Sequence, residues 1–265
     1  MADESPRPRF EPNPEYGRGS FWRRIKLVNR AGLIEAALED NSHAMRCRLM
    51  EAQGIIVGLE AEMIRVPMNI CPSAAAKVNE LIGQPIHISY RSFYSDGKAA
   101  ANCSHLFDLL WLAISHSVRS ASERLYDVTI PDPVDGRATI RVDRDGALVH
   151  EWRVEDGHVT DCGPLQGQNL TRHFIRHALE TFSGDELEAA LVLHKGYIVA
   201  RGRRYRIDDS SPLPESDARR RNACYAFQDD RVGQARRLGS RRSVNGPDDF
   251  AIFLTPWPPP RAPHL

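Results

Sequence analysis

Alternation of apolar and polar residues dominates the N-terminal part of the chain and predicts β-strands. The clearest case is the segment 55–66, in which the glutamates face away from an apolar row: Ile55, Val57, Leu59, Ala61 and Met63, against Glu60 and Glu62. This pattern is typical of a sheet with one buried face and one wet face. The same reasoning predicts strands at 21–29, 32–38 and 44–50, with a hairpin loop at 51–54 before the last strand.

Two runs with helical periodicity follow these strands, at 72–82 and 105–120. Each begins beside a cysteine. Cys71 precedes Pro72, a residue favoured in the first helical turn, so we expect Cys71 to be an N-cap. Cys103 precedes a strongly apolar run. Because a helix N-terminus favours the thiolate form, both cysteines are candidate nucleophiles or metal ligands.

Prolines on both sides of Asp132 mark the best candidate for a linker. Beyond it, the pattern predicts strands at 137–143 and 147–154 and helices at 170–182 and 186–194. The predicted fold class is α+β: an N-terminal antiparallel sheet with two covering helices, followed by a second, smaller α+β part. The expected division is a disordered or draped arm at 1–20, a module at 21–128, a second part at 129–208 and an irregular Arg- and Pro-rich tail at 209–265.

Charge and cysteine content narrow the class of protein. The chain has 265 residues and a formal net charge of zero, so non-specific binding of nucleic acid is not expected. No run approaches the roughly 18 apolar residues of a membrane span, and the N-terminus lacks the apolar core of a signal peptide. Five cysteines without such a signal do not indicate a disulfide framework. We therefore expect a cytoplasmic protein with reduced thiols, with no nucleic-acid or membrane partner, and the sequence leaves a homo-oligomer open.

The expected hairpin pairing brings more candidates towards the two cysteines. If Met50 faces Ile55, Asp40 lies opposite Arg65. Arg65 then falls on the apolar, inward face and needs an anion, which Asp40 or a ligand can supply. One end of the module is thus predicted to gather the following side chains: Asp40, His43, Arg65, Cys71, Cys103 and His105.

This set predicts a metal-assisted or thiol-dependent enzyme. Thiolates with imidazole and carboxylate groups suit zinc or iron, so one such ion is expected on Cys71, Cys103 and one or two of Asp40, His43 and His105. The ion would polarise a carbonyl or activate water in a lyase- or hydrolase-type reaction, Arg65 would orient the carboxylate of a small anionic organic substrate, and His105 or Asp40, if not a ligand, would move protons. In the metal-free alternative, Cys71 is the nucleophile and His105 or His43 its base.

Other polar residues have a simpler interpretation. Cys47 and Cys162 are interpreted as packing residues, and Asp108 as part of a solvated helix face. His173 and His177 are spaced i, i+4 but lack the glutamate of a metalloprotease motif. The arginine runs at 201–206 and 236–242 are interpreted as solvated faces, with a site for an anionic ligand as the alternative.

Five blocks of sequence resemble a bacterial family known only as a domain of unknown function. They include Asn-Pro-Glu-Tyr-Gly at 13–17 and Cys-Ser-His-Leu at 103–106, and the others lie at 38–43, 65–72 and 224–228. The resemblance extends over nearly the whole chain. It implies no established reaction.

Residues 40–118 also resemble the NifU-type iron–sulfur scaffold module, in which one cysteine precedes a helix and a His-Cys-Ser-x-Leu-type block opens another. Cys71 would match the middle cysteine and Cys103 the last, while Asp40 or His43 stands where that family has its first cysteine and aspartate. The histidine here follows Cys103, and a Gly-Cys-Gly is replaced around Cys71, which favours a single metal ion over an iron–sulfur cluster. The resemblance leaves a non-catalytic iron–sulfur or sulfur scaffold, or a small-molecule binding module, as alternatives to the enzyme.

Overall fold

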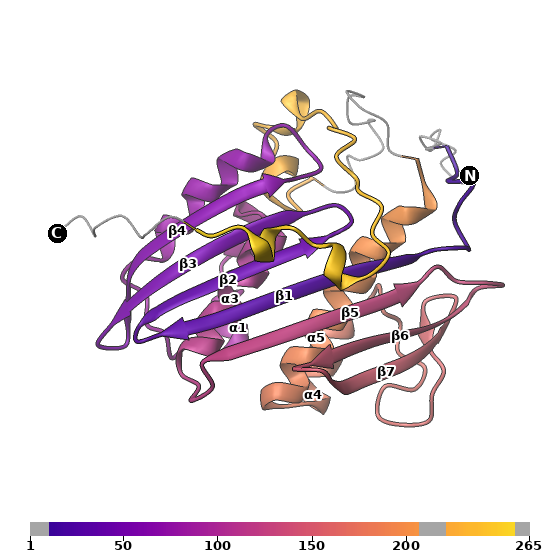
Figure 1. The fold of residues 1–265 in the computed structure, drawn as a ribbon, viewed down its shortest axis with the longest axis horizontal. Helices are drawn as coiled ribbons and strands as arrows, with labels where there is room; N and C mark the ends of the chain where they lie inside the picture. Colours follow the sequence, from indigo (N-terminus) through magenta and orange to yellow (C-terminus); the bar gives the residue numbers. More distant parts are fainter. Residues whose placement is uncertain (1–10, 207–220, 258–265) are drawn as a thin grey trace.

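A single antiparallel sheet organises the chain, with its longer α-helices packed behind one face (Figure 1). The structure, a computed structural model, describes residues 11–206 and 221–257, so the expected arm and tail lie partly outside it. The sheet has eight strands in the order β4-β3-β2-β1-β5-β6-β7-β8. The strands are β1 Ser20–Arg30, β2 Leu33–Asp40, β3 Ala44–Ala52, β4 Ile55–Arg65, β5 Glu123–Pro131, β6 Arg137–Arg144, β7 Ala147–Glu155 and β8 His158–Val159.

The helices differ in length and type. The α-helices are α1 Tyr90–Phe93, α2 Lys98–Ala101, α3 Ser104–Ser117, α4 Phe174–Thr181 and α5 Gly184–Ala200. The 3-10 helices are η1 Cys71–Leu81, η2 Arg201–Arg204, η4 Tyr225–Phe227, η5 Val232–Gln234, η6 Pro247–Asp249 and η7 Ile252–Leu254. The first predicted helix is therefore a 3-10 helix whose N-cap is Ile70, so Cys71 lies inside the helix and is not its cap. Cys103 is the N-cap of α3.

Binary patterning accounts for the two faces of the sheet. In β1, Phe21, Arg23, Ile25 and Leu27 are buried, while the residues between them are less so. This buried face carries the core: α3 packs on β1, β2 and β3, and α5 packs on β1, β5, β6 and β7. The N-terminal antiparallel sheet with covering helices, and the α+β class, are confirmed.

The sheet does not stop at the expected boundary between residues 128 and 129. That boundary falls within β5, which pairs with β1 from Ser20–Pro131 to Val28–Glu123, so one continuous sheet joins both parts. Burial alternates along β5, and its inward positions are mostly apolar: Tyr126, Val128 and Ile130. This alternation at 123–131 is the pattern of a half-buried strand, and Pro131 ends it instead of opening a linker.

The expected register of the second hairpin is wrong. Ala52 pairs with Ile55, and Ala44 pairs with Arg65. The cause is the turn: Gln53 and Gly54 both have positive φ, which is the backbone of a two-residue type I′ turn instead of a four-residue loop. Two bulges shift the register further. Arg65 consequently lies on the sheet face opposite α3, and not on the inward face.

Residues 240–257 cross this outer face as a strap that contains η6 and η7, drawn in yellow in front of the sheet in Figure 1. Arg46 donates a hydrogen bond to the carbonyl oxygen of Thr255 at 3.2 Å. The guanidinium groups of Arg46 and Arg48 lie 4.7 and 4.4 Å from the ring centre of Trp257. Charged side chains on the outer face are therefore buried, and Arg48 is only 2% exposed.

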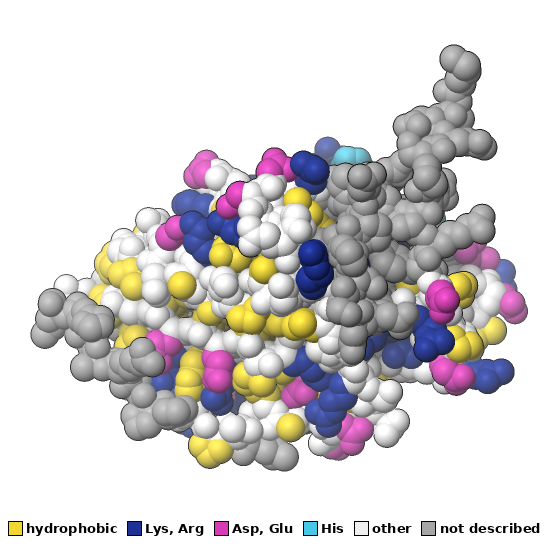
Figure 2. All heavy atoms as spheres, turned by 90° about the horizontal axis from the view of Figure 1, so that it is seen from above, with side chains coloured by type: hydrophobic (Ala, Val, Ile, Leu, Met, Phe, Trp, Pro, Cys, Tyr) yellow, Lys and Arg dark blue, Asp and Glu magenta, His cyan; other side chains and the backbone are white. Residues whose placement is uncertain are grey.

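The surface agrees with the balanced charge. On the face shown in Figure 2, basic and acidic side chains are interspersed. In the part of the chain that the structure describes, no helix combines the length and apolar character that crossing a membrane requires.

Replacing Gly196 by Val is expected to lower the free energy of unfolding by about 1–3 kcal/mol, because overpacking a close helix–sheet contact is costly. A Cβ at Gly196 would lie 3.0 Å from Val128 Cγ1 and 3.4 Å from Ile130 Cδ1. Urea denaturation measures the loss. The matched control is Gly233→Val, where a Cβ would meet no atom within 4 Å. Equal stability of the two variants would contradict the proposed close approach.

Candidate functional site

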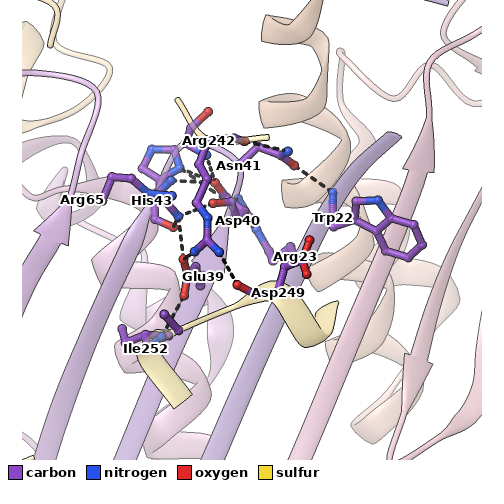
Figure 3. Close-up of polar contacts among 12 residues, drawn as sticks. Trp22, Arg23, Glu39, Asp40, Asn41, His43, Arg65, Arg242, Asp249 and Ile252 are labelled. Carbon is purple, nitrogen blue, oxygen red and sulfur yellow. Dashed lines mark hydrogen bonds and ion pairs between the residues drawn. The ribbon is translucent and has the colours of Figure 1, made fainter. Parts of the chain in front are cut away.

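Asp40, at the end of β2, is a fully buried carboxylate (Figure 3). Its Oδ2 accepts hydrogen bonds from Arg23 Nε at 3.1 Å and Nη2 at 2.7 Å, because Arg23 of β1 is the cross-strand partner of Asp40. Its Oδ1 accepts the backbone N–H groups of Ser42 and His43 at 2.7 and 2.8 Å. Burial alone would raise the pKa of Asp40, but the charges of His43 and Arg23 and the hydrogen bond from His43 hold it well below the usual range.

Asp40 also positions two histidine rings. His43 Nδ1 lies 3.1 Å from Asp40 Oδ1, so the carboxylate favours the tautomer with the proton on Nδ1. The ring of His43 in turn lies 4.2 Å, centre to centre, from the ring of His105 in the first turn of α3. Burial, and then the nearby charges of His43 and Arg23, lower the pKa of His105 well below 6.5. The imidazole of His105 is therefore neutral near pH 7.

His105 lines a pocket between α3 and α5, closed on another side by α1. Most of its wall is apolar and comes from β1, β2, α3 and α5. The polar side chains of the wall are Arg23, Tyr90, Tyr94, His105, Asp108 and Lys195. An apolar pocket with a few convergent polar groups is the usual form of a small-molecule site.

Two polar atoms of this pocket wall lack partners. Within residues 11–206 and 221–257, His105 Nδ1 and Asp108 Oδ2 are buried and make no hydrogen bond. The other carboxylate oxygen, Asp108 Oδ1, accepts from Tyr94 Oη at 2.5 Å and lies 3.1 Å from Lys195 Nζ. Burial and the charge of Asp108 raise the pKa of Tyr94, so the phenol keeps its proton. A buried polar atom without a partner costs about 1–3 kcal/mol, and two in one pocket point to groups that a ligand satisfies.

Arg65 does not face this pocket. Its Nη2 donates to Glu39 Oε1 at 2.9 Å and to the carbonyl oxygens of Asp40 and His43 at 2.6 and 3.1 Å (Figure 3). The expected role in binding a substrate carboxylate is therefore replaced by a structural one. Arg65 holds the turn that carries Asp40 and His43 in place.

The cysteines form a second group beside the site. Cys71 and Cys103 are each 8% exposed, and each thiol lies within electrostatic range of Cys224. Burial raises the pKa of Cys103 to about 12 and raises that of Cys71 still further. Backbone N–H groups of His105 and Leu106 act in the opposite direction at Cys103, but loss of hydration outweighs them. Both thiols stay protonated near pH 7, against the expected thiolates.

The predicted metal ligands do not converge. Among the residues that the structure describes, no group of three or more His, Cys, Asp or Glu side chains is arranged to hold a metal ion. Asp40, His43 and His105 come together as predicted, whereas Cys71 and Cys103 do not complete a ligand set with them. The zinc or iron ion remains a prediction from the sequence.

Sequence reasoning missed five polar residues of the pocket: Arg23, Tyr90, Tyr94, Asp108 and Lys195. A signal for Arg23 is present, because it occupies an inward position between Phe21 and Ile25 in an alternating strand. Asp108, interpreted as solvated, is only 16% exposed and bonded to Tyr94. No local pattern joins α1, α3 and α5, so the pocket depends on tertiary packing.

Residues 26–119 match a family model described as a protein of unknown function (DUF2889). The match confirms the resemblance to an uncharacterised family for less than half of the chain. It includes the blocks at 38–43, 65–72 and 103–106, and excludes those at 13–17 and 224–228. It gives no support to the NifU-type resemblance. The chain has no significant match among curated proteins.

Proposed function

We propose that the pocket between α3 and α5 is the active site of an enzyme that moves a proton on a small, mostly apolar organic molecule with one anionic group. The observation that carries this proposal is the pair of buried, unpartnered atoms, His105 Nδ1 and Asp108 Oδ2, in one pocket. Such atoms are ready to accept or donate hydrogen bonds to a substrate.

His105 is the proposed general base. Its lowered pKa keeps the imidazole neutral at physiological pH, so a ring nitrogen can accept a proton from the substrate. Asp40 and Arg23 do not touch the substrate in this proposal. They act as positioning residues through His43, whose ring packs against His105.

Lys195 supplies the positive charge for an anionic substrate group. Its ammonium group lies 3.1 Å from Asp108 Oδ1, and Tyr94 donates to the same oxygen. These two donors hold the Asp108 carboxylate through Oδ1, so Oδ2 is left to accept a hydrogen bond from the substrate. The single proton of the Tyr94 phenol is engaged in this hydrogen bond, so Tyr94 acts as a positioning residue for Asp108.

Replacing His105 by Gln is expected to lower kcat by at least about 100-fold, because a positioned base contributes roughly 10²–10⁴-fold. The assay follows proton exchange and turnover in a panel of small hydroxy and keto acids with apolar chains. Substrate binding, measured by NMR, should weaken only a few-fold, since glutamine retains hydrogen-bonding groups. The matched control is His87→Gln, at an exposed position.

Two results would contradict the proposal. Full turnover by His105→Gln would show that His105 is not the general base. Substrate binding without any proton exchange would favour a binding module that has no catalytic activity. Dialysis against a chelator tests the metal interpretation separately. Activity lost on dialysis and restored by zinc or iron would return the site to the metal centre predicted from the sequence.

A further inference from the structure

A second pocket lies in the other half of the sheet, where η2 follows α5. Its floor is apolar and includes Ile130 of β5, Val154 of β7 and Ala200 of α5. Its space, including the open mouth, is about 420 Å³. It shares no wall residue with the pocket of His105.

Two guanidinium groups on its rim lack an acidic partner. Within the described ranges of the chain, neither Arg201 nor Arg204 pairs with a carboxylate, and Arg204 Nε donates to the hydroxyl of Tyr16 at 3.0 Å. Arg203, which lies between them in the sequence, does have an acidic partner: it donates two hydrogen bonds, of 2.7 and 2.9 Å, to the buried Asp132. A guanidinium is charged at any ordinary pH, so two unpaired ones at the mouth of a pocket favour an anion.

Tyr197 adds a hydrogen-bond donor to this pocket. Its side chain lines the same pocket and is 8% exposed, and its hydroxyl, which makes no hydrogen bond within the described ranges, is not closed off from solvent. Burial raises the pKa of Tyr197, while the charges of Arg201 and Arg204 oppose this rise, which places both guanidiniums near the phenol. A tyrosine hydroxyl that is accessible from the pocket can donate a hydrogen bond, and an anion held by the two arginines would accept it.

We propose that this pocket is a second binding site, for a small molecule with an apolar body and a single carboxylate or phosphate group. Arg201 and Arg204 hold the anion, Tyr197 donates a hydrogen bond to it, and the apolar body covers the floor at Ile130 and Val154. The arginine run at 201–206 is then a recognition element and not only a solvated face. The site does not depend on the function proposed for the His105 pocket.

Calorimetric titration with four probes tests the site: benzoate, phenyl phosphate, inorganic phosphate and benzamide. At least one of the first two should bind ten-fold or more tightly than inorganic phosphate, which lacks the apolar body, and than benzamide, which lacks the charge. The comparison of benzoate with phenyl phosphate identifies the anion. The double variant Arg201→Gln with Arg204→Gln should bind the preferred probe at least ten-fold more weakly. Tyr197→Phe should bind it several-fold more weakly.

Two control variants separate this site from the rest of the molecule. Arg153→Gln removes an exposed arginine outside the pocket, and His105→Gln changes the other pocket; neither should alter the affinity. Three results would overturn the proposal: no saturable binding of either anionic probe, equal binding of benzamide, or unchanged affinity in the double arginine variant. Loss of binding in His105→Gln would also overturn it, because the probe would then occupy the other pocket.

Discussion

Replacing Asp40 by Ala should lower the free energy of unfolding by about 3–5 kcal/mol, which is the usual cost of removing one partner of a buried ion pair. Asp40 is fully buried and Arg23 is 2% exposed, so the variant leaves the guanidinium without its counter-ion and without access to water. It also removes the acceptor for two backbone N–H groups at Ser42 and His43. Urea denaturation at pH 7 measures the change.

Two further variants make this expectation specific. Adding Arg23→Met to Asp40→Ala should recover part of the lost stability, because no buried charge then remains. The control Glu155→Gln removes an exposed pair with Arg137 and should cost no more than about 1 kcal/mol. A loss below about 1 kcal/mol for Asp40→Ala would contradict the buried pair.

Lowering the pH from 7 to 4 should decrease the free energy of unfolding by about 3 kcal/mol through the protonation of His194 alone. This side chain is 6% exposed, stacks on Phe174 and has its Nε2 2.9 Å from the carbonyl oxygen of Leu170. Burial, and then the charge of Lys195, lower its pKa to about 4, whereas an unfolded histidine titrates near 6.5. The unfolded chain therefore binds a proton first as the pH falls. Stability is full above about pH 6.5, decreases towards pH 4 and levels off below it.

The contribution of His194 is tested by comparing the pH dependence of urea denaturation in the wild type and in His194→Gln, because the glutamine cannot be protonated. The variant should lose less stability than the wild type between pH 6.5 and 4, although it starts from a less stable protein. His105 has the same direction of shift and should add to the acid sensitivity. The exposed His87→Gln should follow the wild type. Parallel curves for wild type and His194→Gln would show that His194 titrates normally.

Sequence patterning predicted most of the strands and missed their arrangement. The strands at 21–29, 32–38, 137–143 and 147–154 were predicted correctly, because alternation is a local property that burial of one face imposes. The continuous sheet was not predicted, because β5 pairs with a strand about a hundred residues earlier and no local signal specifies that partner. The register of β3 and β4 was wrong because it depends on the type of one turn.

The candidate site was predicted in part for a similar reason. Asp40 and His43 are three residues apart, so their contact follows from a tight turn. Their contact with His105 needs α3 to pack on β2 and β3, which the expected sheet and covering helices implied. Lys195 comes from α5, beyond the expected boundary, and was invisible to an interpretation that divided the chain at residue 128. The thiolate form expected for Cys71 and Cys103 is opposed by burial, which raises the pKa of both thiols, because sequence position shows helix N-termini but not hydration.

The strap over the outer face has a consequence for biosynthesis. A ribosome adding about 5–20 residues per second completes β4 roughly 10–40 s before it reaches Trp257. Throughout that interval the face later covered by the strap stands in water, with Glu39, Arg46 and Arg48 upon it. An apolar face of this size would invite association between nascent chains, whereas a charged one stays hydrated. The cation–π contacts and carbonyl acceptors of the strap allow the completed protein to bury this charged surface. The same surface remains hydrated while the chain is being synthesised.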